Sequence, residues 1–278
     1  MLAIALGLAA GLSWGVSDFL GGLKSRTLEL VAVLVLSQGA ALVLVGVVVA
    51  ARGQSPPPGE ELLYAGLAGV SGLIGLAAFY RGLAVGAMAV VAPIAGTGAV
   101  IPVVVGLATG ERPSVAQGAG IALAIAGVVL ASRETPAEGQ RARATGVGLA
   151  LVAAAGFGFF FVGMDAGAES DLLWALLATR GASVACLIVA VAALRPGFAG
   201  TRASAGALLA IGVLDVGANG LFAVAASEGL ISVAAVLASL YPVITVLLAR
   251  AVLGERVQQA QRAGIVAAMA GVALISAG

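Results

Sequence analysis

Two stretches of the chain repeat each other. Gly110–Ser132 reads GERPSVAQGAGIALAIAGVVLAS, and Gly254–Ser276, 144 residues later, reads GERVQQAQRAGIVAAMAGVALIS. Fourteen of the 23 positions are identical, and they include the charged pairs Glu111-Arg112 and Glu255-Arg256. Matches of Ala and Gly arise easily in an apolar sequence, but a repeated charged pair does not. The chain therefore contains an internal duplication.

The composition predicts that lipid is the solvent for most of the chain. Of the 278 residues, 61% are hydrophobic and only 10% are charged. A soluble domain has roughly 45–50% apolar and about 25% charged residues. One protein core of this length could not bury so many apolar side chains. We therefore expect an all-α membrane protein.

Ten apolar stretches, most of them close to the roughly 20 residues that a transmembrane helix needs, are candidates for membrane spans. Seven of them contain no charge: 30–51, 62–80, 82–110, 113–132, 144–164, 229–249 and 263–278. The other three, 2–23, 172–194 and 203–227, each contain one charged residue, namely Asp18, Arg180 and Asp215. The sequence therefore predicts ten transmembrane helices.

The duplication divides these helices into two repeats of five, at 1–134 and 145–278, joined by a loop at 135–144. Five is an odd number, so the second repeat enters the membrane from the opposite side. The repeats are therefore expected to be inverted, with a substrate site near the midplane and alternating access by movement of one half against the other. This predicts a multi-pass transporter of the cell membrane.

Other classes of protein are not supported by the sequence. A net charge of +1 argues against a nucleic-acid partner. The single Cys186 and the lack of His leave no pattern for a disulfide or a transition-metal site. There is no P-loop and no Ser/His/Asp set, so we expect neither an enzyme nor a cofactor. Residues 1–23 lack a basic leader and are interpreted as a retained helix.

Asp215 is the most informative candidate for a binding residue. It lies near the middle of the eighth predicted helix, where an acid costs about 2.5–3.5 kcal/mol, and such a residue should face a cavity or a partner. Asn219 and Phe222 follow one and two turns later on the same face. Asp215 could contact a cationic group of the substrate or carry a coupling proton. Alternatively, Arg180 could neutralise it in a structural pair.

Further candidates lie on other helices. Trp14 and Asp18 share a face of the first helix, because they are four residues apart. An offset of 147 residues aligns Asp18 with Asp165. The remaining polar candidates for substrate binding are Tyr80, Thr97, Ser239 and Tyr241. Candidate hinges are the prolines that interrupt the fourth and ninth helices, Pro93, Pro102 and Pro242.

The chain resembles the EamA-type ten-helix transporters of the drug/metabolite transporter superfamily. The likeness rests on Trp14-Gly15, on Pro242 to Arg256 with the Gly264…Gly271 helix after it, and on Val91-Ala92-Pro93-Ile94 through Gly110-Glu111-Arg112. It implies a central cavity lined mainly by helices one, three, four, six, eight and nine. It also implies export of small metabolites, often amino acids. Family members usually have Arg in the second helix of each repeat, but Gln38 stands opposite Arg180 here.

The resemblance and the charge pattern predict opposite orientations. The family implies that both termini are cytoplasmic. Cytoplasmic connections would then hold only Arg52, Arg112 and Arg180, with the other eleven basic residues towards the outer face. Basic residues usually gather on the cytoplasmic side. Residues such as Arg81 and Arg250 would not count if they were buried in the bundle, but even then the charge pattern favours termini outside.

The leading interpretation is an exporter of a small polar or amphipathic metabolite, with the lipid bilayer as its surroundings. Proton coupling and a homodimer are further options. One alternative is a multidrug exporter of lipophilic cations, for which Asp18 is the nearest acid in the first helix. Another is a membrane scaffold that transports nothing.

Overall fold

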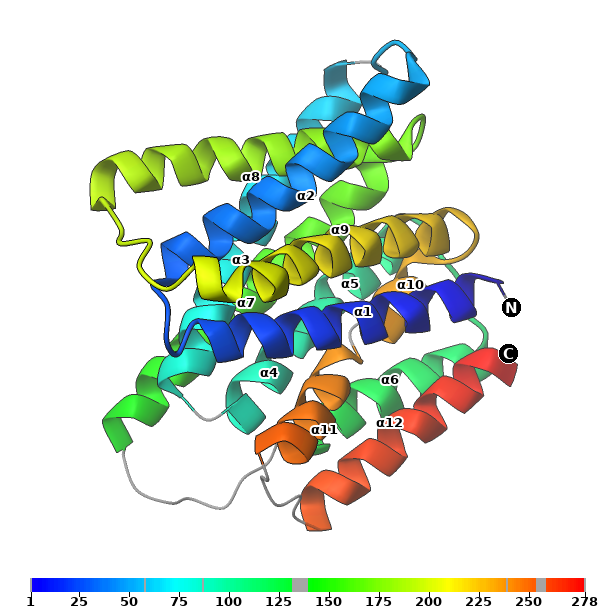
Figure 1. Cartoon of the computed structure of the whole chain (residues 1–278). Helices are drawn as coiled ribbons and strands as arrows, with labels where there is room; N and C mark the ends of the chain where they lie inside the picture. The colour runs from blue at the N-terminus through cyan, green and yellow to red at the C-terminus, as the bar shows by residue number, and fades with distance from the viewer. Residues whose placement is uncertain are drawn as a thin grey trace.

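The computed structural model is a bundle of helices (Figure 1), described for residues 2–57, 59–86, 88–131, 140–238, 240–253 and 259–277. No strand occurs among these residues. The first part of the bundle comprises α1 (Leu2–Lys24), α2 (Leu30–Arg52), α3 (Gly59–Val85), α4 (Met88–Gly96), η1 (Thr97–Ala99), α5 (Val100–Ala108) and α6 (Val115–Ala131). The second part comprises α7 (Gln140–Gly167), α8 (Leu172–Leu194), η2 (Arg202–Ser204), α9 (Ala205–Ser227), α10 (Ile231–Ala238), α11 (Tyr241–Leu253) and α12 (Gln259–Ala277).

The all-helical fold class is confirmed, and the predicted spans are supported in part. Within the described residues, seven segments are long and apolar enough to cross a membrane. They are Leu2–Lys24, Leu30–Arg52, Gly59–Val85, Gly146–Gly167, Leu172–Leu194, Arg202–Ser227 and Val233–Val252. Ile94–Ala108 and Val115–Gly127 are shorter apolar helices at the fourth and fifth predicted spans. Part of the predicted loop 135–144 lies outside the described residues, and its last five residues already belong to α7.

The helices of the two halves pack in a symmetric pattern. By their place in each half, α1, α2, α3 and α6 correspond to α7, α8, α9 and α12. The extensive contacts between the halves include α6 with α12 and α2 with α8, which join counterparts directly. They also include two related pairs: α1 with α9 and α3 with α7, and α2 with α9 and α3 with α8. Exchanging each helix for its counterpart turns the α1–α9 contact into the α7–α3 contact. The same exchange turns the α2–α9 contact into the α8–α3 contact. α1 also begins at the end of the bundle near the termini, whereas α7 begins at the opposite end (Figure 1).

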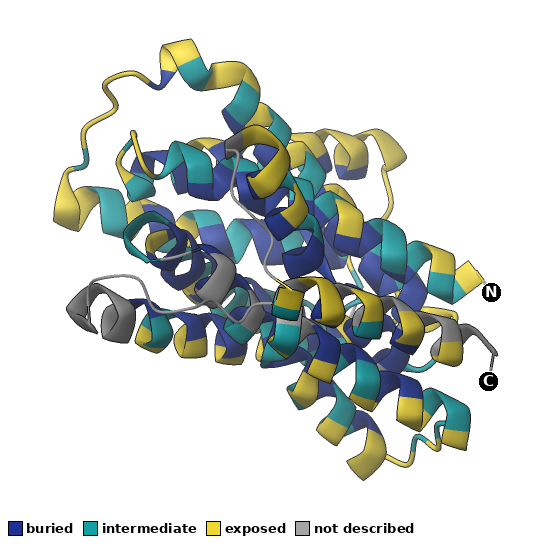
Figure 2. Cartoon of the chain, turned by 90° about the horizontal axis from the view of Figure 1, so that it is seen from below, coloured by how far each residue is buried: buried dark blue, intermediate teal, exposed yellow. Residues whose placement is uncertain are grey.

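The outer surface is apolar. Buried residues gather where the helices meet, and exposed residues lie on the outward faces (Figure 2). Large hydrophobic side chains such as Val47, Leu67, Ile188 and Val189 are 57–68% exposed. A soluble protein rarely exposes large contiguous apolar patches, whereas a bilayer stabilises such side chains. The outward faces are therefore suited to contact with lipid.

The fourth span is broken between two of the predicted hinge prolines. The 3-10 turn Thr97–Ala99 separates α4, which contains Pro93, from α5, which has Pro102 in its first turn. Pro242 likewise lies in the first turn of α11. Proline is tolerated in a first turn because its missing N–H would have no partner there. Whether these breaks act as hinges stays a prediction.

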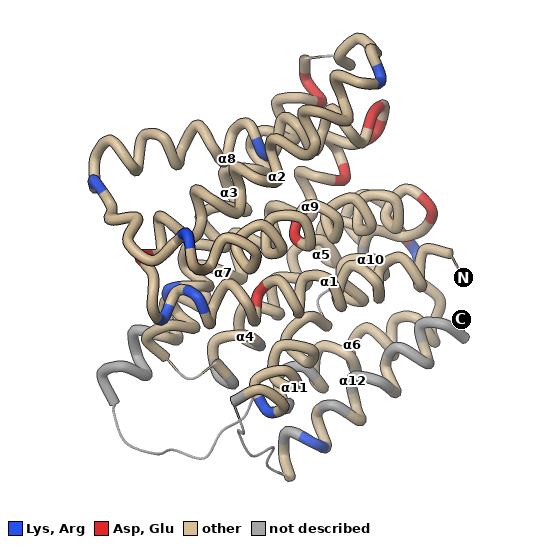
Figure 3. The backbone as a smooth tube through the Cα atoms, viewed as in Figure 1, with Lys and Arg blue, Asp and Glu red and all other residues tan. Residues whose placement is uncertain are grey.

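The two ends of the bundle carry opposite charge (Figure 3). The end where α1 runs into α2 holds described basic residues, namely Lys24, Arg26, Arg81, Arg195 and Arg202. The end near the termini is rich in acids, which include Glu60, Glu61, Glu169, Asp171 and Glu228. Arg81 and Arg250 are both exposed. Both charges are therefore included when the basic residues at the two ends are compared.

The Gly-Glu-Arg turn of the first half forms an inter-half contact. A Glu111 carboxylate oxygen accepts a hydrogen bond from the backbone N–H of Ile231 at 2.7 Å, where α10 begins. A helix N-terminus has free N–H groups and a partial positive charge, so a carboxylate stabilises it. The turn of the first half therefore contributes to the interface between the two halves. Its second-half counterpart, 254–256, lies outside the described residues.

Asp171 caps α8 and provides a test of pH dependence. Its Oδ1 accepts hydrogen bonds from the backbone N–H of Leu173 at 2.9 Å and Trp174 at 3.1 Å, and Arg52 lies 3.2 Å away. Partial burial alone would raise the pKa of Asp171, but the Trp174 N–H, Arg52 and the Leu173 N–H outweigh it and hold the pKa below 3.8.

We expect Asp171→Ala to lower the stability of the protein by about 0.5–2 kcal/mol at neutral pH. Because the folded-state pKa is depressed, this difference should shrink as the pH falls below 3.8 and through the folded-state value. Thermal unfolding in detergent over a pH series measures it. The control is Glu169→Ala, which removes a neighbouring negative charge but leaves the cap of α8 in place. An equal loss in both variants would contradict the capping role.

Candidate functional site

A buried polar network centres on Asp215. Arg180 Nη1 lies 2.9 Å from Asp215 Oδ2 and forms an ion pair with it. Gln38 Nε2 donates to the same oxygen at 3.0 Å, and Trp14 Nε1 donates to Oδ1 at 3.1 Å. Arg180 also donates to the Gln38 side-chain oxygen. Four helices (α1, α2, α8 and α9) therefore meet at one carboxylate, and both of its oxygens have partners.

Small residues and hydroxyls bring these helices close together. On α1, Ser13 and Ser17 donate to the backbone carbonyls of Leu214 and Ile211 on α9, at 2.8 and 3.1 Å. On α8, Ser183 donates to the carbonyl of Gly69 on α3 at 2.9 Å. Contacts of this kind hold helices together in lipid, where apolar side chains gain little by association. They fix the register that places Trp14 against Asp215.

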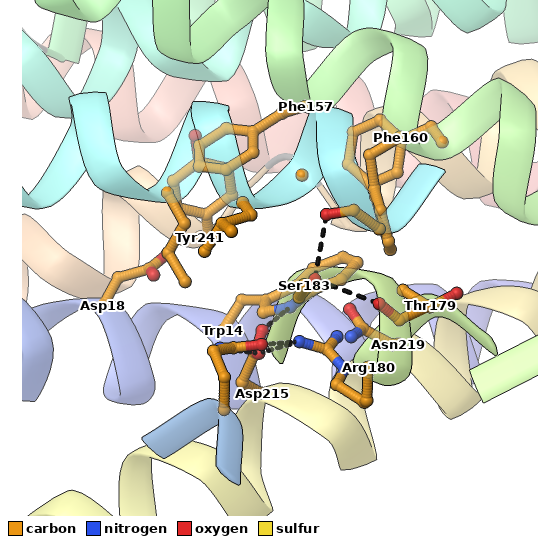
Figure 4. Close-up of a pocket in the computed structure, with 16 residues that line it drawn as sticks. Trp14, Asp18, Phe157, Phe160, Thr179, Arg180, Ser183, Asp215, Asn219 and Tyr241 are labelled. Carbon is orange, nitrogen blue, oxygen red and sulfur yellow. Dashed lines mark hydrogen bonds and ion pairs between the residues drawn. The ribbon is translucent and has the colours of Figure 1, made fainter. Parts of the chain in front are cut away.

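A cavity with an accessible volume of about 50 Å³ adjoins this network. Its lining comes from both halves of the chain and from α1, α2, α3, α7, α8, α9 and α11. The charged residues in the lining are Asp18, Arg180 and Asp215 (Figure 4). A water molecule needs about 10–15 Å³ by this measure, so the cavity has room for only a few waters.

Aromatic rings form one wall of the cavity. Trp14 lies 6.3 Å from Phe160 and 5.7 Å from Phe161 between ring centroids. Phe157 meets Tyr241 nearly at right angles, with centroids 6.2 Å apart. Such edge-to-face pairs are favourable because the ring edge is positive and the face negative. The cavity thus combines a polar side, centred on Arg180, with an aromatic side.

Within the part of the chain that the structure describes, three hydrogen-bond donors of the lining have no partner. They are Nε of Arg180, Nδ2 of Asn219 and the hydroxyl of Tyr241, all buried. A buried donor without a partner costs roughly 1–3 kcal/mol, so these groups are suited to a ligand or to water that supplies acceptors.

The structure brings together most of the residues predicted for the substrate site. Trp14, Asp18, Asp215, Asn219 and Tyr241 all line the cavity. Ser239 lies outside the described residues. The other three predicted residues, Tyr80, Thr97 and Phe222, are not among those lining it.

Each of those three is engaged elsewhere. The Thr97 hydroxyl donates to the Ile94 carbonyl of its own helix at 2.6 Å, as Thr often does in membrane helices. The Tyr80 ring fills the space left by Gly21, where an added Cβ would lie 2.1 Å from it. Phe222 packs behind the wall, 4.7 Å from Phe161 between centroids.

Several lining residues were not predicted from the sequence. They include Gln38 and Thr179, Ser183, Phe157, Phe160 and Phe161. In the sequence, Gln38 stood out only because it occupies the position that corresponds to Arg180 in the other repeat. The second and seventh spans therefore contribute to the lining, beyond the six helices that the resemblance implied. No described residue of α4 or α5 lines the cavity. Small polar residues gave no signal, because in a single sequence they look like helix-packing groups.

A helical bundle with an apolar outer surface and a polar, partly unsatisfied cavity between its halves is typical of a membrane transport protein. The model of the EamA-like transporter family matches residues 1–133 and again 144–277. The chain belongs to this family and is a membrane transporter of the drug/metabolite type.

Other comparisons bear on the fold alone. A search of curated proteins finds no match. Among solved structures, one described only as a crystal structure of a protein matches with a TM-score of 0.73 at 20% sequence identity. The match covers 98% of this chain and 95% of the other. The bundle is therefore a known architecture.

Proposed function

We propose that the protein is a ten-span secondary transporter that exports a small polar or amphipathic metabolite across the cell membrane. The observation that carries the proposal is the cavity, because residues from both halves line it and meet at the Arg180–Asp215 pair. A site between two inverted repeats becomes accessible from either side when one half moves against the other.

The cavity in its present form is too small for an amino-acid-sized cargo, since about 50 Å³ holds only a few waters. The helices around it must separate for the cargo to enter. The Nε of Arg180 and the amide of Asn219 are donors without partners, which suits a carboxylate of the cargo. The aromatic wall suits an apolar side chain. An amino-acid-like molecule has both groups.

Proteoliposomes test the proposal, with exchange of labelled amino acids and aromatic amines across the membrane as the readout. Leu73 lines the cavity, whereas its neighbour Ile74 is 53% exposed on the outer face. We expect Leu73→Trp to abolish exchange by filling the cavity, and Ile74→Trp to leave it near the wild-type rate. Equal exchange in both variants would place the route elsewhere. No exchange by wild type would favour the scaffold.

The charge distribution predicts the orientation. Arg81 and Arg250 are exposed, and basic residues gather at the end of the bundle opposite the termini (Figure 3). The positive-inside rule then places that end in the cytoplasm. We expect a phosphatase fused after Gly278 to be active outside the cytoplasm. A fluorescent protein fused there that lights up in the cytoplasm would instead support the orientation implied by the family.

A further inference from the structure

The charged groups in the cavity lining do not balance. Arg180 contributes one positive charge, and Asp215 neutralises it at 2.9 Å. Asp18 adds a second carboxylate, and no other charged residue lines the cavity among those described. With both acids ionised, the lining has a net charge of −1. One positive charge is therefore missing.

Asp18 is the acid without a counter-charge. It is only 5% exposed, and no hydrogen bond or ion pair joins it to any residue in the described part of the chain. In Figure 4 one group of dashed lines converges on Asp215, the others lie around Ser183, and none reaches Asp18. The two acids thus have different roles: Asp215 is fully partnered by the protein, whereas Asp18 is not.

Among the described residues, no group facing Asp18 supplies a cation. The helices packed on α1 are α3, α9, α10 and α11. The titratable groups that interact electrostatically with Asp18 are Tyr80 on α3, Asp215 on α9 and Tyr241 on α11. The described residues of α10 carry no titratable side chain. Nearby Arg81 is exposed, and Lys24 donates to Ser204.

A buried carboxylate without a partner is strongly unfavourable in a low-dielectric interior. Two things remove that penalty: protonation of the carboxylate, or a cation beside it. The Tyr241 hydroxyl, which lines the same cavity and has no hydrogen-bond partner, can assist either state by donating to a ligand or accepting from one.

Building on the proposed transport function, we propose that Asp18 binds a proton and the ammonium group of an organic cargo alternately. When the ammonium group binds, the Asp18 carboxylic acid releases its proton to water and the carboxylate pairs with the cation. When the cargo leaves, the carboxylate takes up one proton. One positive charge is exchanged for another, so the charges of the lining and of the group bound at Asp18 sum to zero in both states. The Arg180–Asp215 pair remains formed throughout.

The test measures proton release on binding. The probes are 2-phenylethylammonium, which carries the cation and an aromatic ring, and 3-phenylpropionate, which carries only the ring and a carboxylate. Calorimetry in buffers of different ionisation enthalpy gives the number of protons released. For wild type we expect one proton released per 2-phenylethylammonium bound. Its apparent affinity should rise roughly tenfold per pH unit while Asp18 is protonated, by linkage. 3-Phenylpropionate should release none.

Asp18→Asn is the decisive variant, because it keeps the shape of the side chain and removes the charge. We expect it to lose both binding of the cation and proton release, with a melting temperature at or above that of wild type. Asp165→Asn is the matched control, since Asp165 occupies the equivalent place in the second half but is exposed and does not line the cavity. It should behave as wild type.

Two outcomes would overturn the inference. In one, Asp18→Asn binds the cation and releases protons as wild type does. In the other, wild type binds no 2-phenylethylammonium at any pH. Neither outcome touches the transport function, which the Leu73→Trp and Ile74→Trp exchange assay tests separately. A folding failure of Asp18→Asn would show as a lost melting transition. In that case Asp18→Glu, which keeps the acid, should retain proton release, and its absence there would also refute the role of Asp18.

Discussion

Replacing Asp215 by Ala should destabilise the protein by about 3–5 kcal/mol, because it leaves Arg180 charged and without its partner in the interior. The side chains of Arg180 and Asp215 are only 6% and 10% exposed, so bulk water does not replace the lost carboxylate around the guanidinium. Gln38 and Trp14 would also lose their common acceptor. Thermal unfolding in detergent, followed by circular dichroism, measures the loss, and exchange in proteoliposomes should fall with it.

The double variant Arg180→Leu/Asp215→Leu distinguishes two causes of instability. One is the cost of leaving Arg180 charged and unpaired, and the other is the loss of the ion pair itself. A buried ion pair is often no more stabilising than apolar residues of similar volume, so the double variant should melt much closer to wild type than Asp215→Ala does. It should still fail to exchange substrate. If Asp215→Ala melted like wild type, the pair would contribute nothing to stability and Asp215 would have to act on the cargo alone.

The second large effect is expected at Gly212 on α9. A Cβ at this position would lie 2.1 Å from the Ser37 carbonyl oxygen and 3.3 Å from the Ala41 nitrogen, both in the backbone of α2. Over-packing typically costs about 1–3 kcal/mol when side chains can move aside, and here the neighbour is backbone. We therefore expect Gly212→Leu to force α2 and α9 apart and to prevent recovery of folded protein. Size-exclusion chromatography in detergent measures the folded fraction.

Gly217 on the same helix is the control. An added Cβ there meets nothing within 4 Å, and the residue is exposed. Gly217→Leu adds the same side chain on the outer face of the bundle. It should also favour the helix, because glycine is up to about 1 kcal/mol less favourable than other residues inside a helix. It should fold as well as wild type. Equal loss in both variants would mean that the close approach at Gly212 does not limit folding.

The inner arrangement of the cavity could be predicted only in part. An acid or a base in an apolar span is costly, and for this reason Asp215, Arg180 and Asp18 stand out in the sequence alone. Phe157, Phe160 and Phe161 do not, because aromatic residues are ordinary in lipid-facing and core positions alike. Tyr80 and Thr97 were expected at the cavity. Which way each side chain points depends on the rotation of its helix, and a uniformly apolar helix does not reveal that rotation.

The sequence by itself determined the class of protein, its duplication and its family. The apolar composition indicates that lipid surrounds the chain, and the repeated Gly-Glu-Arg segments reveal the two halves. Both are properties of the sequence that do not depend on contacts in space. Only the tertiary structure decided that Asp215 is partnered and Asp18 is not. That difference arises where four helices from both halves meet. It depends on distances between residues as far apart in sequence as Trp14 and Asp215, which local pattern does not encode.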